Sequence, residues 1–331
     1  MATRPAGKAG PHSWYADDPV DLKKQLQNYL ATVPSSIDEV PLPISGARIV
    51  IAPHAGYDYS GECAAWAYKT LDLGQAERVF ILGPTHTYSF EGCAATTFGK
   101  YATPLGDLTI DRETVQTLKD AISAQEVEIE DMPTKNEKSE HSLEMHMPYL
   151  YLQCQEAFDS PDHFPKIIPL LIGSTDGNSE KAIGRVLLPY IMDPANAFII
   201  SSDFCHWGDK NFGYSVYSPT SNLSDLVRLR RWDPKPWGLP IHETIRAVDE
   251  AAMDAVESGD HAAFLHTLRK TQNTVCGRHP IGVMMAALEL LGEQPGYEGK
   301  GRFKVIQYQR STLVQEPDDF SVSYVSAYAV V

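Results

Sequence analysis

The sequence is poor in cysteine and has no long apolar run, and each absence excludes a class of protein. Its five cysteines, in 331 residues, include no close pairs, which fits neither a disulfide framework nor a zinc-finger spacing. No segment is apolar over the length needed to span a bilayer. Residues 1–12 lack the apolar stretch of a secretory signal, so we expect a flexible N-terminal tail there. This pattern predicts a reduced, cytoplasmic compartment, and nothing in it excludes the nucleus.

Positive charge is also scarce. The chain has 28 lysines and arginines against 43 aspartates and glutamates, which gives a formal charge of -15 at pH 7. Nucleic acids and anionic membrane surfaces are normally captured by basic patches, so we expect neither as a partner. The sequence has no G-x-x-x-x-G-K-[ST] motif and no well-placed G-x-G-x-x-G, which argues against a nucleotide-binding enzyme.

Apolar runs alternate with helical patterns along most of the chain. With 43% hydrophobic residues, the chain can bury one large core. The alternation predicts a single α/β domain over residues 13–331, with a mostly parallel or mixed central sheet and helices on both faces. We expect strands at 47–52, 79–83, 167–172, 197–201, 302–308 and 321–331, and helices beginning at Asp18-Pro19 and spanning 61–71, 111–122, 141–157, 178–192, 242–271 and 279–291.

Residues 210–240 show little periodicity. They are rich in Ser, Pro, Asp and Arg and contain Trp232 and Trp237. Long segments without regular structure are often binding loops or lids, so we predict an extended exposed loop here. The acidic run from Glu126 to Asp131 is typical of a solvated loop or helix end.

Histidines and an aspartate follow three of the predicted strands. His54 comes after the first, His86 after the second, and Asp203 and His206 after the strand at 197–201. Because the carboxyl ends of parallel strands meet at one edge of a sheet, we expect these side chains to share a crevice. A single loop histidine is more often structural, but three at equivalent strand ends indicate a functional site.

Cys276 stands just before a predicted helix that begins near Pro280. The helix dipole favours the thiolate at such a position, and a thiolate is the form that binds metals. We therefore expect Cys276 to be reactive or metal-binding. The other cysteines, Cys63, Cys93, Cys154 and Cys205, are expected to be buried and inert.

The segment 140–148 superficially suggests a metallopeptidase, but it lacks the H-E-x-x-H motif. His141 and His146 are five positions apart, about 140° around a helix, so they cannot share a face. His141 and Glu144 would share a face and are expected to line the pocket. Glu140 is interpreted as a favourable first-turn carboxylate.

Five motifs in order resemble the Memo family. They are IAPHAGY at 51–57, FILGPTH at 80–86, EHSLEMH at 140–146, SSDFCHWG at 201–208 and CGRHPIG at 276–282, and the likeness runs from Ser13 to the final strand. The resemblance implies a fold similar to the catalytic subunit of class III extradiol dioxygenases, which are non-haem iron enzymes. It also implies iron or copper bound at His54, His86 and Cys276.

The family resemblance carries functional expectations as well. Members are linked to cell motility and redox signalling, with phosphotyrosine-peptide binding in animals. Two departures limit what can be transferred. Extradiol dioxygenases complete their iron site with a carboxylate where this chain has Cys276, so ring cleavage cannot simply be carried over. Residues 210–240 also look longer than in animal members, so a partner surface there would differ.

Three functional hypotheses follow. In the first, His54, His86 and Cys276 bind Fe(II) or copper, with zinc chemically allowed, and Asp203 and His206 orient ligands or move protons. In the second, the pocket is a non-catalytic adaptor site for a peptide or phosphopeptide, with Arg278 and the pocket histidines, His279 included, supplying positive charge. In the third, Cys276 is a metal-free nucleophile with a histidine and Asp203. Whether the protein is an enzyme is left open between them.

Overall fold

The central sheet forms where the most apolar segments of the chain pair with one another. The computed structural model describes residues 2–331, and within them this sheet has nine strands. Four of them lie side by side and run parallel: β4 (Ile49–Ala52), β11 (Asn196–Ser201), β5 (Arg78–Pro84) and β10 (Lys166–Ile172). Every residue of β4 and β11 is buried, as expected for strands covered on both faces.

Antiparallel strands extend the sheet on both sides, so the predicted mixed sheet is confirmed. The order is β12-β16-β4-β11-β5-β10-β6-β9, with β15 paired to β16. The bounds of these flanking strands are β6 (Cys93–Ala95), β9 (Ile129–Asp131), β12 (Asp203–Trp207), β15 (Phe303–Arg310) and β16 (Ser321–Ala329). The last two residues of the acidic run, Glu130 and Asp131, thus lie in an edge strand.

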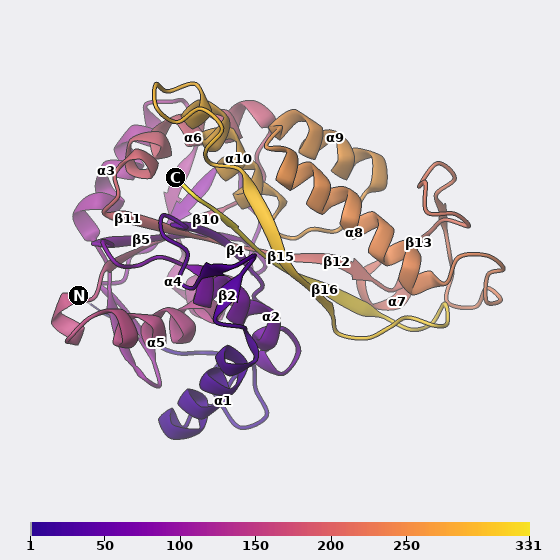
Figure 1. Ribbon diagram of the computed structural model, residues 1–331, viewed down its shortest axis with the longest axis horizontal. Coiled ribbons are helices and arrows are strands. Elements are labelled where there is room, and N and C mark those ends of the chain that lie inside the picture. The colour runs from indigo at the N-terminus through magenta and orange to yellow at the C-terminus, as the bar shows by residue number, and fades with distance from the viewer. Residues whose placement is uncertain (1) are drawn as a thin grey trace.

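Helices cover the sheet on its two faces (Figure 1). On one face, α2 (Tyr57–Thr70) packs on β4, β15 and β16, with α1 (Pro19–Thr32) and α5 (Met147–Ala157) against it. On the other face, α10 (Arg278–Gly292) packs on β5 and β11 and against α6 (Gly177–Met192). The predicted α/β architecture is therefore confirmed.

The remaining longer helices are α3 (Arg112–Ser123), α8 (Ile241–Ser258) and α9 (His261–Thr271).

Helix ends follow from local chemistry. The Asp18 side chain accepts hydrogen bonds from the backbone N–H groups of Val20 and Asp21, so α1 begins where its cap predicts. The expected helix over 242–271 is instead two helices. Gly259 has a φ of 72°, a left-handed conformation that glycine adopts at low cost and that ends α8, and Asp260 caps α9.

The helix expected over 141–157 begins later than predicted. Residues 144–146 form a 3-10 turn, and α5 starts only at Met147, with Pro148 in its first turn. In the segment before this turn, the Glu140 carboxylate accepts the backbone N–H groups of His141 and Ser142 at 2.9 and 3.0 Å.

The N-terminal residues are packed against the domain. Strand β1 (Thr3–Arg4) pairs with β7 (Lys100–Thr103) in a small sheet completed by β8 (Gly106–Thr109). Arg4 is 1% exposed. The flexible tail predicted for residues 1–12 is therefore wrong for the described residues 2–12, because composition could not show that an arginine there has buried partners. Residue 1 lies outside the described residues.

Arg4 is held by four acceptors, one of them the Pro5 carbonyl at 3.1 Å. Its guanidinium donates to the Glu144 carboxylate at 2.7 Å, to the Glu140 carbonyl at 2.6 Å and to the Glu137 carbonyl at 2.9 Å. Glu137 belongs to α4 (Thr134–Ser139). A guanidinium is stable in the interior only when its donors are satisfied in this way.

The segment 210–240 projects from one end of the molecule, beyond α8 at the right of Figure 1. It contains the end of α7 (Asp209–Phe212) and a short pairing of β13 (Val216–Tyr217) with β14 (Val227–Arg228). Tyr217 and Leu229 are buried in a small apolar cluster with Trp207. Trp232 and Trp237 are 70% and 96% exposed.

Two further features complete the fold. Strands β2 (Ser36–Ile37) and β3 (Val40–Pro41) form a separate hairpin-like pair. Within residues 2–331, no helix has both the length and the apolar character needed to cross a membrane.

Candidate metal centre

Three potential ligands converge at the carboxyl-terminal edge of the parallel strands. His54 follows β4, His86 follows β5, and Cys276 comes from the loop that leads into α10. One donor atom from each of these side chains lies within 4.8 Å of the others. The fold thus brings together the three residues that the sequence suggests as metal ligands.

The His54 ring is fixed with a free nitrogen. Its Nδ1 lies 2.6 Å from Ser201 Oγ, and the Ser201 hydroxyl donates its only proton to the Ser142 carbonyl at 2.7 Å. Nδ1 must therefore carry the proton and donate to Ser201. Nε2 then presents its lone pair, and it lies 3.2 Å from Cys276 Sγ.

His86 is oriented by Glu140 in the same manner. Its Nδ1 lies 3.0 Å from Glu140 Oε1, and its backbone N–H donates to Oε2 at 2.7 Å. The carboxylate accepts from Nδ1, which leaves Nε2 free. Burial would raise the pKa of Glu140, but hydrogen bonds from His86 and Ser142 and the electrostatic interaction with the His86 ring lower it to about 2. Glu140 is therefore ionised at neutral pH.

Glu140 was not predicted as a site residue. Its role depends on His86, which is 54 positions earlier in the chain. The signal available in the sequence was a carboxylate directly before a histidine, which is also a common pattern at helix starts. Only the tertiary contact separates the two interpretations. A histidine whose Nδ1 donates to a carboxylate is the usual arrangement of imidazole ligands in metal sites.

Cys276 lies just before α10, as expected, but the thiolate is not the favoured form. Burial and the neighbouring negative charge of Asp203 raise the pKa of the thiol well above its ordinary value. These effects outweigh the helix dipole, so the expectation of a thiolate is wrong for the site without a cation. Its Sγ accepts the Asp203 N–H at 3.3 Å. Gly277 allows this close approach, since a Cβ there would lie 2.4 Å from the Ser201 carbonyl.

Asp203 and His206 border the three donors. Asp203 Oδ1 accepts the His54 N–H at 2.9 Å, and its Oδ2 lies 3.9 Å from His54 Nε2. Burial raises the pKa of Asp203, although the charge of His206 opposes this shift. His206 Nδ1 faces two carbonyl oxygens, those of Phe204 at 2.8 Å and Thr274 at 3.1 Å, so its Nε2 is the free nitrogen.

His141 belongs to the site. Its ring stacks on His86 at a centroid distance of 4.3 Å and meets His54 edge-on at 5.3 Å. Trp14 covers its outer side, with a centroid distance of 4.5 Å. Burial and the charge of His86 lower the pKa of His141 to about 3, so this ring is neutral at physiological pH.

Glu144 does not line the site, which corrects the sequence expectation. Its carboxylate accepts hydrogen bonds from Arg4, from the Lys8 N–H at 2.7 Å and from Tyr15 Oη at 2.8 Å. The prediction placed residues 141–144 in one α-helix, whereas residues 141–143 are not helical and Glu144 begins a 3-10 turn. His146 points elsewhere, as expected, with its Nδ1 2.6 Å from Tyr68 Oη.

Arg278 and His279 lie on a cavity beside Cys276 rather than among the histidines. This cavity has a volume of about 730 Å³ and is also lined by Thr274. His279 Nδ1 lies 2.9 Å from Thr175 Oγ1 and 3.1 Å from Glu180 Oε1. Arg278 and His279 are thus close to the candidate ligand Cys276 and separate from His54 and His86.

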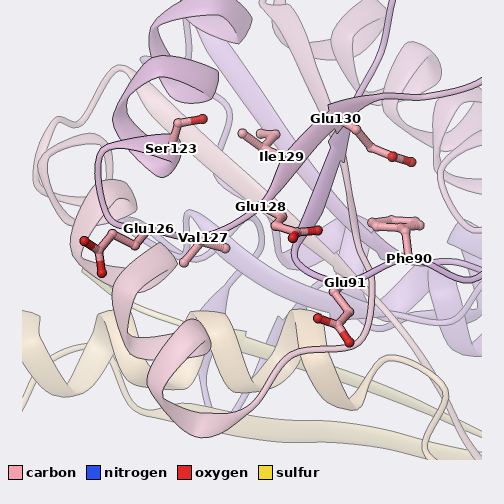
Figure 2. Close-up of a pocket in the computed structure, with 8 residues that line it drawn as sticks. All are labelled: Phe90, Glu91, Ser123, Glu126, Val127, Glu128, Ile129 and Glu130. Carbon is pink, nitrogen blue, oxygen red and sulfur yellow. The ribbon is translucent and has the colours of Figure 1, made fainter.

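Another cavity lies next to the edge strand β9. Figure 2 shows a cavity of about 450 Å³ next to β9, with Phe90 and Ile129 among glutamates. The carboxyl groups of Glu126, Glu128 and Glu91 lie on different sides of it in Figure 2 and do not converge. It contains none of the predicted site residues, and three of its acidic groups, Glu126, Glu128 and Glu130, belong to the acidic run in the sequence.

Comparison with known proteins shows the family of this chain. The family model described as Memo-like protein matches residues 4–328. The chain belongs to the Memo family. It is 38% identical to protein memo-1 homolog of Caenorhabditis elegans, covering 99% of this chain and 83% of that protein. It is 37% identical to a MEMO1 family protein of Schizosaccharomyces pombe (99% of each chain) and 36% identical to human protein MEMO1 (100% and 98%).

The family resemblance in the motifs is therefore confirmed across nearly the whole chain. Among solved structures, an uncharacterized protein of Escherichia coli K12 matches with a TM-score of 0.44 and 13% identity, covering 85% of this chain and 98% of that one. That likeness is too distant to carry an argument about the site of this Memo family chain.

Proposed function

We propose that this Memo family chain binds one iron or copper ion through His54, His86 and Cys276 and uses it in redox chemistry. Two functions are consistent with such a bound metal: reduction of oxygen to superoxide, and buffering of the metal. The observation that carries the proposal is the grouping of two imidazoles, each held by a partner on Nδ1, with one nitrogen of each ring within 4.8 Å of the Cys276 sulfur. Two imidazoles and a thiolate suit Fe(II) and copper, and zinc is chemically allowed.

The residues around these donors have distinct tasks in the proposal. Ser201 and Glu140 hold the two rings so that their lone pairs stay available. Cys276 would release its proton when a cation binds, because only the thiolate is a ligand. Asp203, whose pKa burial raises, can hold a proton at its carboxyl group beside His54. Bound iron or copper would supply one-electron chemistry towards oxygen.

Titration of the metal-stripped, reduced protein with Fe(II), Cu(I) and Zn(II) tests the binding. We expect one ion per chain, with binding lost in His54→Ala and in Cys276→Ala. Matched controls are His163→Ala, an exposed histidine, and Cys154→Ala, a buried cysteine away from the site. Absence of binding in the unmodified protein would contradict the proposal.

A second measurement separates redox chemistry from metal buffering. Protein loaded with Fe(II) or Cu(I) is exposed to oxygen with a thiol reductant, and superoxide is followed by reduction of cytochrome c. We expect superoxide from the loaded protein and none from the zinc-loaded form, because zinc has no accessible redox change. Equal signals from both forms would leave metal buffering as the function.

The adaptor function is the alternative proposal. Arg278 is exposed and could contact a phosphoryl group, which favours binding of a phosphopeptide. However, Asp176 and Glu180 line the same cavity and balance the charges of Arg269 and Arg278, so the wall has no surplus of positive charge for a dianionic phosphate. We rank this function second. The link to cell motility and signalling and the cytoplasmic or nuclear location are predictions from the family resemblance.

A further inference from the structure

The cavity beside Cys276 has the features of a small-molecule site. Its walls come from α6, α9 and the start of α10, and its volume is about 730 Å³. This falls within the range of about 300–1,000 Å³ that is usual for ligand pockets. Leu265, Leu268 and Val275 form an apolar part of the wall, so the cavity can accept a ligand with an apolar body.

Arg278 presents unused donors at this cavity. Its Nε donates to His279 Nε2 at 3.1 Å. Within residues 2–331, neither of its terminal nitrogens has a hydrogen-bond or ion-pair partner. The two terminal nitrogens of a guanidinium form a planar fork that matches the two oxygens of a carboxylate.

A buried network fixes the position of this arginine. His279 Nδ1 faces the Glu180 carboxylate and the Thr175 hydroxyl, which itself donates to Glu180 at 3.1 Å. Nδ1 must therefore carry a proton, and Nε2 accepts from Arg278 in the neutral ring. His261 lies 2.6 Å from the other oxygen of Glu180, which is 1% exposed. Gly282 lets α10 approach this carboxylate, because a Cβ there would lie 2.4 Å from it.

A second polar group on the cavity wall also lacks a partner. Asn273 is 5% exposed, and its amide nitrogen donates to Asp249 at 3.0 Å. Its side-chain oxygen is buried and has no hydrogen-bond partner among the described residues. Because this oxygen has almost no accessible surface, it lies behind the cavity wall and is not counted among the ligand contacts.

We propose that the cavity binds a small organic carboxylate, with Arg278 pairing to the carboxylate and the apolar wall contacting the rest of the ligand. A monoanion suits the site better than a phosphate dianion, since Asp176 and Glu180 on the cavity wall balance the charges of Arg269 and Arg278. Arg278 is two positions from Cys276, so the bound ligand lies next to the candidate metal centre. A role of the bound carboxylate as a substrate or as a metal ligand rests on the proposed function. The binding of the carboxylate to Arg278 does not.

Binding is tested on the intact, metal-stripped protein with phenylacetate as the probe and phenylacetamide as its uncharged match. Saturation-transfer NMR titrations give the dissociation constants. We expect phenylacetate to bind and phenylacetamide to bind at least about tenfold more weakly. Arg278→Gln should weaken phenylacetate binding by a similar factor, and Arg278→Lys should weaken it less, because the charge is kept and the fork is lost.

Two controls make the assignment specific. Arg246→Gln removes an exposed arginine on α8 and should leave binding unchanged. His279→Gln should weaken phenylacetate binding but not to the level of Arg278→Gln, because His279 only positions the guanidinium. Equal binding of the two probes, or unchanged binding in Arg278→Gln, would overturn the proposal. Tighter binding of inorganic phosphate than of phenylacetate would overturn the carboxylate assignment.

The outcome is independent of the metal hypothesis. Since these titrations use metal-free protein, loss of metal binding in the earlier experiment leaves the carboxylate site standing. Conversely, a protein that binds iron or copper but not phenylacetate would retain the proposed function and lose this inference.

Discussion

At the scale of single residues, the candidate metal centre depends on partners that fix each donor. His54 and His86 each use Nδ1 to donate, one to Ser201 and the other to Glu140, and so keep Nε2 free. An imidazole with a free nitrogen and a fixed ring loses little entropy on binding a cation. The partners, as much as the ligands, therefore determine how strongly the site can bind.

Glu140→Gln should weaken metal binding by about 10–100-fold, because the amide keeps the shape but loses the charge that orients His86. Competition titration against a chelator of known affinity measures the change. Glu128→Gln, at an exposed glutamate outside the site, is the control and should bind as the unmodified protein does. If Glu140→Gln bound metal with unchanged affinity, the carboxylate would be structural only.

At the scale of elements, the N-terminal strand β1 is attached to the wall of the site. Arg4 bonds to the carbonyl of Glu140 and the carboxylate of Glu144, and both residues belong to the segment that precedes α5. Trp14, at the end of the same N-terminal segment, stacks on His141. The N-terminal segment thus stabilises the loop from which Glu140 and His141 reach the site.

Arg4→Met should lower the free energy of unfolding by about 3 kcal/mol, because it leaves the buried Glu144 carboxylate without its cation. Urea unfolding followed by circular dichroism gives the value. Arg231→Met removes an exposed arginine and should change stability by less than about 0.5 kcal/mol. Similar small effects for both variants would show that the buried pair is not important for stability.

Asp111 gives a pH-dependent prediction for α3. Burial alone would raise its pKa, but hydrogen bonds from Thr114 and Arg78 lower it overall. A carboxyl group with a lowered folded-state pKa contributes stability above its unfolded pKa and loses it as the pH falls through the folded value. Asp111→Asn should therefore cost about 1 kcal/mol at pH 7 and progressively less below about pH 4.

Urea unfolding of both proteins at pH 7 and at pH 3 checks this dependence. Asp120→Asn, at an exposed position of the same helix, serves as the control and should show no such trend. A cost for Asp111→Asn that is the same at both pH values would show that the carboxylate charge contributes nothing to the cap.

At the scale of the whole molecule, the sheet edge carries the candidate site and the segment 210–240 extends away from the body at one end (Figure 1). Only its start approaches the site, where the Phe212 ring meets His206 at a centroid distance of 5.2 Å. The small apolar cluster around Trp207 anchors the segment. This arrangement favours an exposed arm over a lid that closes on the metal centre.

The double variant Trp232→Ser with Trp237→Ser should leave metal affinity unchanged and alter the free energy of unfolding by less than about 0.5 kcal/mol, since both rings are exposed. Calorimetric titration and urea unfolding provide the two values. Trp207→Ala, at a buried tryptophan, should by contrast cost about 3–5 kcal/mol. A drop in metal affinity in the double variant would show that the segment closes over the site.

The sequence by itself determined the alternation of buried strands and helices and therefore the class of fold. It also placed His54 and His86 at one edge, because the carboxyl ends of neighbouring parallel strands must meet there. It could not place Glu140 or Glu144, because the prediction assumed an early start of α5. In the structure α5 starts only at Met147, and Glu140 contacts His86, a residue 54 positions away, which no local pattern shows.

Only the tertiary structure decided which atoms are free and which groups are charged. The contact between Cys276 and His54 spans 222 positions, and that between Arg4 and Glu144 spans 140. A hydrogen-bond partner, a buried cation or a raised thiol pKa arises from such contacts, and local patterns carry no information about them. Secondary structure and the edge of the sheet follow from neighbours in sequence, whereas protonation and donor orientation follow from neighbours in space.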